Sequence, residues 1–124
     1  MASIRARGNR STELQVRLAL VRNGVDGWKM HAKDVPGTPD FWFVKRRIAI
    51  FVDGCFWHGC RCSRLPAHNA GYWVPKISGN MRRDKLVRAR LKRQGIHVLQ
   101  IWEHDVRDSG KLRLFVSQLA MAPQ

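Results

Sequence analysis

The sequence predicts one small mixed α/β domain, in which helices cover the faces of a short central sheet. Its 124 residues suffice for one hydrophobic core but not for two. Segments with helical periodicity alternate with short apolar runs of strand type. An irregular segment that holds all three cysteines separates the two halves of the chain. The expected order is helix, strand, strand, cysteine segment, helix, strand and helix, within a single domain over 11–121.

The N-terminal part is predicted to be a flexible arm followed by a helix. Residues 1–10 are polar and basic, which is typical of a disordered arm. A helix is expected over about 12–23, ending at Asn23-Gly24. Glu13 would then lie in the first turn, where the helix dipole favours a negative charge. The residues expected to face the core are Leu14, Leu18 and Val21.

The first two strands are predicted over 41–44 and 47–53. The second contains the uninterrupted apolar run 48–52, which is typical of a strand buried on both faces. Because only Lys45-Arg46 separates the two strands, we expect them to form an antiparallel hairpin.

The second half of the chain is predicted to begin with an irregular stretch over 54–79. Asn80 is then expected to cap a helix over about 81–94. A third strand follows over 97–102, and a last helix over 111–120. The apolar residues expected to face inward are Leu86, Val87 and Leu91 in the first of these helices and Leu112, Phe115 and Leu119 in the second. The first helix also carries a basic face, formed by Arg82, Arg83, Lys85, Arg88, Arg90, Lys92 and Arg93.

The charge of the chain predicts a polyanionic partner. There are 23 Lys and Arg against 9 Asp and Glu, which gives a net charge of +14 and an isoelectric point near 11.3. Such a surface favours nucleic acid over a membrane surface. No apolar run approaches the ~20 residues of a membrane span, and the N-terminus lacks the apolar stretch of a signal peptide. We therefore expect a cytoplasmic location, where clustered cysteines bind metal more readily than they form disulfides.

Two carboxylates stand at the ends of the predicted hairpin. Asp40 precedes its first strand and Asp53 ends its second, so the hairpin would bring them close together. The pair could hold Mg²⁺ together with water and a substrate phosphate, and the ion would activate a bound water. The alternative is that both are turn residues, Asp40 after Pro39 and Asp53 before Gly54.

Three cysteines within eight positions offer ligands of the kind that zinc prefers. They are Cys55, Cys60 and Cys62. The fourth ligand is expected to be His104, which follows the third strand, with His58 and His68 as competitors. A closed four-ligand site would hold the loop at 54–79 in place without catalysing a reaction. The alternative is that the cysteines are three unconnected small apolar side chains.

The same loop contains a histidine and two aromatic residues. Near a metal ion and a phosphate, His58 could move a proton, although a place beside or within the zinc site is the alternative. Phe56 and Trp57, together with Trp73, could insert between base pairs and unstack them. Core packing is the ordinary alternative for each aromatic side chain.

Several motifs, in order along the chain, match one family of proteins. They are Pro36-Gly37-Thr38-Pro39-Asp40-Phe41, then Phe51-Val52-Asp53-Gly54-Cys55-Phe56-Trp57-His58-Gly59-Cys60, then Trp73 with Lys76-Ile77 and Asn80, then Arg83-Asp84, and finally Gly95-Ile96-His97-Val98-Leu99 with Trp102-Glu103-His104. From about residue 4 to 120 the chain resembles the very-short-patch repair DNA mismatch endonucleases. The resemblance implies a restriction-endonuclease-like fold and a Mg²⁺-dependent cut in one DNA strand, 5′ to the thymine of a T:G mismatch.

The resemblance also implies roles for individual residues. Asp40 matches the metal-binding aspartate, Val52 a further metal contact through its carbonyl, and His58 the catalytic histidine. Glu13 matches a carboxylate near the water network, and Asp84 matches the acid of the following helix. The implied zinc ligands are Cys55, Cys60, Cys62 and His104, and the implied DNA wedge is Phe56, Trp57 and Trp73. One branch of the family has Thr-His in place of Val52-Asp53, which leaves the division of work between Asp53 and His58 open.

The resulting hypothesis is a zinc-containing, Mg²⁺-dependent nicking endonuclease of very-short-patch mismatch repair. Asp40, Asp53 and the Val52 carbonyl would hold Mg²⁺, and the basic residues Arg82, Arg83 and Lys85 would hold the phosphates of double-stranded DNA. We expect a monomer in the cytoplasm of a bacterial cell, associated with the nucleoid, with mismatch-repair proteins as candidate partners. The rival hypotheses are a sequence-directed nickase of restriction or defence and a non-catalytic zinc DNA-binding module.

Overall fold

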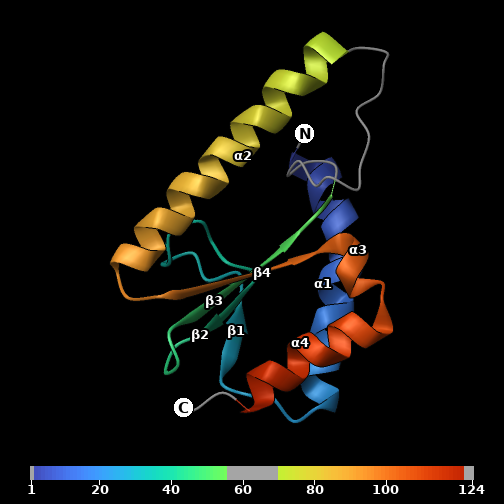
Figure 1. The fold of residues 1–124 in the computed structure, drawn as a ribbon, viewed down its shortest axis with the longest axis vertical. Coiled ribbons are helices and arrows are strands. Elements are labelled where there is room, and N and C mark those ends of the chain that lie inside the picture. The colour runs from blue at the N-terminus through green and yellow to red at the C-terminus, as the bar shows by residue number, and fades with distance from the viewer. Residues whose placement is uncertain (1, 56–69, 122–124) are drawn as a thin grey trace.

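The computed structural model describes residues 2–55 and 70–121 of the chain. Over these ranges the chain forms a four-stranded sheet with helices on both faces (Figure 1), so the predicted mixed α/β class is confirmed. In chain order the elements are α1 (Ala2–Arg22), β1 (Trp28–Met30), β2 (Phe41–Phe43), β3 (Ile48–Asp53), α2 (Ala70–Arg93), β4 (His97–Trp102), α3 (Glu103–Val106) and α4 (Ser109–Met121). None of the described helices is both long enough and apolar enough to cross a bilayer.

The sheet has the strand order β1-β2-β3-β4 and mixes two kinds of pairing. β2 and β3 form the predicted antiparallel hairpin, with Phe41 opposite Ile50 and Phe43 opposite Ile48. β4 lies parallel to β3, because α2 returns the chain to the end of the sheet where β3 began. The third predicted strand is therefore confirmed, whereas β1 and the single-turn helix α3 were not predicted.

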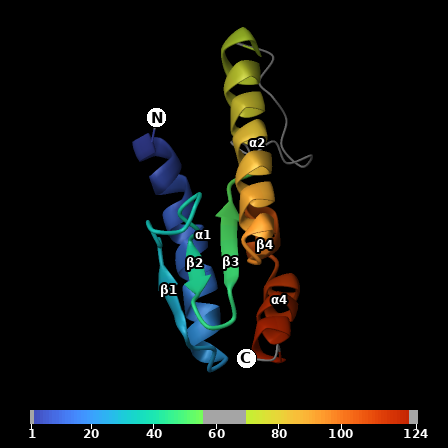
Figure 2. The ribbon, with the colours of Figure 1, turned by 90° about the vertical axis from the view of Figure 1, so that its left-hand side faces the viewer.

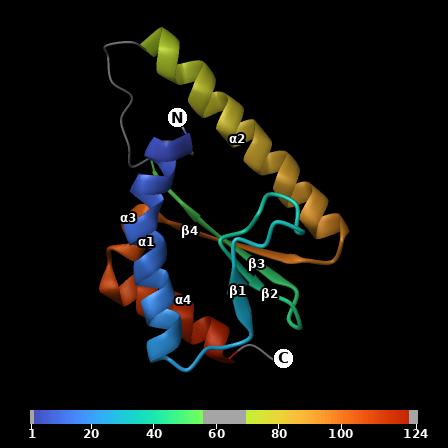
Figure 3. The ribbon, with the colours of Figure 1, turned by 180° about the vertical axis from the view of Figure 1, so that it is seen from behind.

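Each face of the sheet is covered by its own layer of helices. Figures 1 and 3 show α1, α3 and α4 on one face and α2 on the other. Alternation along the strands sends Phe41, Phe43 and Ile50 into the larger core with α1 and α4, and sends Trp42 and Ala49 toward α2. The hairpin is therefore buried on both sides, as its continuous apolar run predicted.

Helix α1 differs from the prediction in its start and in the face that it buries. It begins at Ala2 and covers most of the segment expected to be a flexible arm, so the predicted start near 12 is wrong and Glu13 lies in the middle of the helix. The predicted inward stripe is also wrong, because Leu14, Leu18 and Val21 are 50%, 41% and 60% exposed. Within 11–22, the part of α1 whose burial is described, the buried residues are Thr12, Glu13, Val16 and Leu20. A carboxylate on the inward face breaks the apolar periodicity on which the prediction relied.

Helix α2 is longer than predicted. It begins at Ala70, so Asn80 is inside the helix rather than at its cap, and the expected irregular stretch is wrong over 70–79. Leu91 is buried as predicted and Val87 packs beside it, but Leu86 is 67% exposed. Figure 2 shows the first turns of α2 extending beyond the end of β3.

The last helix agrees with its predicted apolar stripe. α4 begins at Ser109, slightly before the predicted start, and Leu119 is buried in the larger core. Leu112 and Phe115 pack against the same core from partly exposed positions.

Candidate active site

Three strand ends meet at one edge of the sheet. Because β1 and β2 are antiparallel, His31, just after β1, lies opposite Asp40, just before β2. The His31 N–H donates a hydrogen bond of 3.2 Å to the Asp40 carbonyl. Asp53 ends β3 at the same edge, so the hairpin gathers polar side chains there, as its ends predicted.

The carboxylate of Asp40 is held against the backbone of β3. Its Oδ2 accepts a hydrogen bond of 2.7 Å from the Val52 N–H. This side-chain bond lies just before β2 begins, and it fixes the direction of the carboxylate. Two residues of the predicted metal site, Asp40 and Val52, thus lie in direct contact.

Glu13, His31 and Asp40 form one group of ligand-type side chains. Glu13 projects from the inward face of α1, and its Oε2 lies 2.9 Å from His31 Nε2. His31 Nε2 lies 3.9 Å from Asp40 Oδ1. One ligand atom from each of the three side chains lies within 4.8 Å of the others. This spacing is compatible with a single bound cation.

His31 is the member of this group that sequence reasoning missed. It follows a strand of only three residues, which is too short to give a periodic signal. The only local sign is that Trp28 and Met30, two residues apart, both pack against the larger core just before it.

Burial and a neighbouring acid raise the pKa of Asp40. The pKa of Asp40 is raised from 3.8 to about 8, mainly by burial and next by the side-chain hydrogen bond with Glu13. The Val52 N–H acts in the opposite direction, since it favours the charged form, but it is outweighed. Without a cation, Asp40 therefore keeps a proton near neutral pH beside Glu13.

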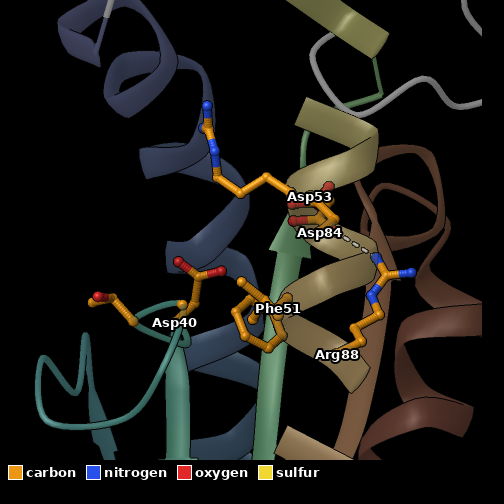
Figure 4. A pocket seen from close by; sticks show the side chains of 9 residues that line it. Asp40, Phe51, Asp53, Asp84 and Arg88 are labelled. Atoms are coloured by element: carbon orange, nitrogen blue, oxygen red, sulfur yellow. Dashed lines mark ion pairs between the residues drawn. The ribbon is translucent and has the colours of Figure 1, made fainter. Parts of the chain in front are cut away.

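Asp40 and Asp53 line one cavity of about 120 Å³, as the hairpin argument predicted. Figure 4 shows the two carboxylates with Phe51 from β3 and with Asp84 and Arg88 from α2. The predicted acid Asp84 therefore lies in the wall of the site.

Asp53 has different partners from Asp40. Its side chain is 5% exposed, and Arg88 Nη2 lies 3.5 Å from its Oδ2 (Figure 4). The side-chain amide of Gln100 donates a hydrogen bond to the same oxygen. Asp53 thus joins β3 to α2 and β4, and it is not a member of the group of Glu13, His31 and Asp40.

Two of the four predicted zinc ligands also lie together. Cys55 Sγ is 3.2 Å from His104 Nδ1, and the other ring nitrogen of His104 is 3.3 Å from Asp105 Oδ1. The other zinc and loop residues of the prediction lie outside the described residues: Phe56, Trp57, His58, Cys60, Cys62 and His68.

The predicted DNA-contacting cations lie along α2. Arg82, Arg83 and Lys85 are exposed. Arg82, Lys85 and Arg88 line a second cavity of about 410 Å³, which shares Asp84 and Arg88 with the first. Trp73 lies near the start of α2, where its ring meets that of Tyr72 edge to face with 4.8 Å between centroids.

Comparison with known proteins identifies the family. The family described as DNA mismatch endonuclease Vsr matches residues 1–64, which is just over half of the chain. The DNA mismatch endonuclease Vsr of Escherichia coli K12 is 35% identical over 113 residues, 89% of this chain and 72% of that protein. The chain belongs to the Vsr family. The family predicted from the motifs is therefore confirmed.

Other similar proteins carry the name type II nicking enzyme. V.XorIIP of Xanthomonas oryzae is 45% identical over 87 residues, which are 68% of this chain and 64% of that protein. V.NaeI of Lentzea aerocolonigenes is 46% identical over 68 residues, which are 54% of this chain and 41% of that protein. The matches to these two enzymes span less than two thirds of their lengths.

Proposed function

We propose that this Vsr-family chain is a divalent-metal-dependent endonuclease that nicks one strand of duplex DNA at a T:G mismatch, 5′ to the thymine. The observation that carries the proposal is the Asp40 carboxylate, bound to the Val52 N–H at 2.7 Å and grouped with Glu13 and His31. The names of the relatives, a mismatch endonuclease and nicking enzymes, support the same reaction class.

The residues of the site fit a cation such as Mg²⁺. The largely buried carboxylates of Glu13 and Asp40 lie next to each other, and the charge of Glu13 disfavours the charged form of Asp40. A divalent ion would relieve this repulsion, and Mg²⁺ needs only one or two protein carboxylates beside water and phosphate. The Val52 backbone is close enough to Asp40 for its carbonyl to contribute. Arg88 and Gln100 would compete with the ion for Oδ2 of Asp53.

The bound ion would supply Lewis acidity and lower the pKa of a water molecule. Asp40 would position the ion, and the nearby Glu13 carboxylate would orient the attacking water. Arg88, at the boundary of the two cavities, would hold a phosphate oxygen. His58 keeps the role that the family resemblance gives it, which is the catalytic histidine.

DNA binding is assigned to the exposed cations of α2, with Arg82, Arg83 and Lys85 on the phosphates. Phe56, Trp57 and Trp73 keep their proposed role as a wedge at the mismatch. We further propose that the chain acts as a monomer in the cytoplasm, near the nucleoid, and that its fold is of the restriction-endonuclease type. The acids at one edge of a mixed sheet favour that fold.

A structural zinc site is the second metal proposal. In a tetrahedral site, sulfur and nitrogen ligands at ordinary bond lengths are about 3.5 Å apart, close to the 3.2 Å between Cys55 Sγ and His104 Nδ1. The contact of the other ring nitrogen with Asp105 matches the carboxylate partner that zinc-binding histidines usually have. Cys60 and Cys62 would complete the four ligands.

A nicking assay tests the proposed function. Duplexes that differ only in a central T:G or T:A pair are incubated with the protein in Mg²⁺ or in EDTA. Mg²⁺-dependent cutting of the thymine strand in the T:G duplex alone is the expected result. Cutting of neither duplex under any divalent ion would refute the endonuclease and would favour a non-catalytic zinc DNA-binding module.

A sequence-directed nickase is the second candidate, because the relatives V.XorIIP and V.NaeI are named as nicking enzymes. It predicts equal cutting of matched and mismatched duplexes within one sequence context. A panel of contexts around a fixed T:G pair separates the two functions, since a mismatch endonuclease leaves every matched duplex intact.

A further inference from the structure

The geometry around His31 sets it apart from the other described histidines. Its backbone φ of 52° lies in the left-handed region, where residues other than glycine are uncommon. The backbone is held there by the hydrogen bond from its N–H to the Asp40 carbonyl. In this conformation Nε2 faces the carboxylates of Glu13 and Asp40.

The three side chains have the spacing of ligands around one ion. Octahedral coordination with bonds of about 2.1 Å separates neighbouring ligand atoms by about 3 Å and opposite ones by about 4.2 Å. The distances of 2.9 Å and 3.9 Å from His31 Nε2 to Glu13 and Asp40 fall at and between these values. Small side-chain shifts would therefore suffice to place all three ligands on one ion.

Their exposure leaves the rest of the coordination sphere open. The side chains of Glu13 and Asp40 are only 12% and 17% exposed, whereas that of His31 is 51% exposed. The carboxylates are thus fixed from the protein side, and the imidazole stands at the solvent boundary. Water and a DNA phosphate could reach the remaining positions from the His31 side.

We propose that His31 is a nitrogen ligand of the divalent ion, in a set with Glu13 and Asp40. The assignment rests on the metal-dependent function proposed above and adds a residue to it. Imidazole nitrogen binds Mn²⁺ and Co²⁺ in preference to Mg²⁺, which favours oxygen ligands. The site therefore binds Mn²⁺ more tightly than Mg²⁺, and His31 is responsible for much of that difference.

Electron paramagnetic resonance with Mn²⁺ tests this ligand directly. Titration of the full chain gives the Mn²⁺ affinity, and electron spin echo modulation reports nitrogen bound to the ion. The wild-type chain is expected to show ¹⁴N modulation, which changes when its histidines carry ¹⁵N. In His31→Gln, whose amide can still hydrogen-bond to Glu13, the modulation should disappear. Mn²⁺ affinity should fall about tenfold or more, and Mg²⁺ affinity by clearly less.

His97→Gln is the matched control. His97 is exposed at the start of β4, at the opposite end of the sheet from the site, so its removal should change neither modulation nor affinity. Absence of nitrogen modulation in the wild-type chain, or its persistence in His31→Gln, would overturn the assignment.

Parallel nicking assays keep this result separate from the proposed function. Nitrogen modulation that depends on His31, in a chain that cuts no DNA, would support the ligand and refute the endonuclease. Mn²⁺-dependent nicking without nitrogen modulation would overturn the ligand and leave the endonuclease intact.

Discussion

The two aspartates of the cavity at the sheet edge have opposite surroundings. Asp40 faces a second carboxylate, Glu13, and the half-exposed imidazole of His31. Asp53 faces the guanidinium of Arg88 and the amide of Gln100. Both carboxylates are largely buried, and both come from the ends of the same hairpin.

The difference favours the proposed metal-binding role for Asp40 and a structural role for Asp53. A buried carboxylate must be neutralised by a proton, a cationic side chain or a metal ion. Asp53 already has a cationic partner within the protein. Asp40 has an acidic neighbour and retains a proton, which is the state that a divalent ion can replace.

The largest expected effect comes from removing the carboxylate of Asp40 from the proposed metal site. Asp40→Asn should lower the nicking rate on a T:G duplex by about a thousandfold or more, because the ion loses its fixed ligand. Duplex binding should persist, since a negative charge near the phosphates is removed. Single-turnover nicking and a filter-binding assay measure the two properties. The exposed Asp34→Asn should behave like the wild type; nicking by Asp40→Asn at the wild-type rate would refute the assignment.

The next effect is a pH dependence that belongs to Asp40. In the metal-free folded chain Asp40 keeps its proton up to about pH 8, whereas the unfolded chain releases it near 3.8. Between these values the unfolded state binds fewer protons, so stability falls as pH rises, by about 2–5 kcal/mol for this group. Urea denaturation at several pH values measures the slope. Asp40→Asn should flatten it relative to Asp34→Asn, and an unchanged slope would contradict the origin in Asp40.

A smaller effect on stability is expected from breaking the ion pair between Arg88 and Asp53. Arg88→Ala leaves Asp53 buried without the guanidinium of its ion pair, which should lower the free energy of unfolding by about 1–3 kcal/mol. Arg90→Ala, on the exposed surface of the same helix, is the control. Adding Asp53→Asn to Arg88→Ala should restore part of the loss. Additive losses in the double variant would show that the ion pair does not stabilise the fold.

The smallest predicted effect concerns the contact between the loop before Asp40 and helix α2. Gly37 has a φ of 81°, and a Cβ there would overlap the Val87 side chain of α2. Gly37→Ala should therefore destabilise the fold by about 1 kcal/mol more than Gly27→Ala, whose φ of 84° is similar but whose Cβ would meet open space. Adding Val87→Ala should reduce the excess. Equal losses of stability in Gly37→Ala and Gly27→Ala would show that the close approach of the loop before Asp40 to α2 does not stabilise the fold.

The sequence predicted the part of the fold that hydrophobic patterns control. The hairpin, the strand at 97–102 and the apolar stripe of α4 all follow from runs of buried residues, and all three are confirmed. Asp40 and Asp53 were placed in one cavity by the same reasoning, because a hairpin brings its two ends together.

The missed features are those in which polar groups take the place of apolar ones. Glu13 occupies the inward face of α1, so the periodicity selected the exposed stripe of Leu14, Leu18 and Val21 instead. His31 follows a three-residue strand that has no pattern of its own. The partners of Asp53 come from α2 and β4, and such long-range pairing has no local signature.

If the chain acts on duplex DNA as proposed, the length of α2 would fix an interval along that duplex. From Trp73 near the start of α2 to Arg88 in the cavity, the axial distance is about 22 Å at about 1.5 Å per residue. Along B-form DNA this corresponds to roughly six to seven base steps. A duplex lying parallel to the helix would meet an aromatic surface at one end and the proposed metal site at the other. The footprint on the DNA would then be asymmetric. The spacing between the two contacts would be set by a helix rather than by a hinge.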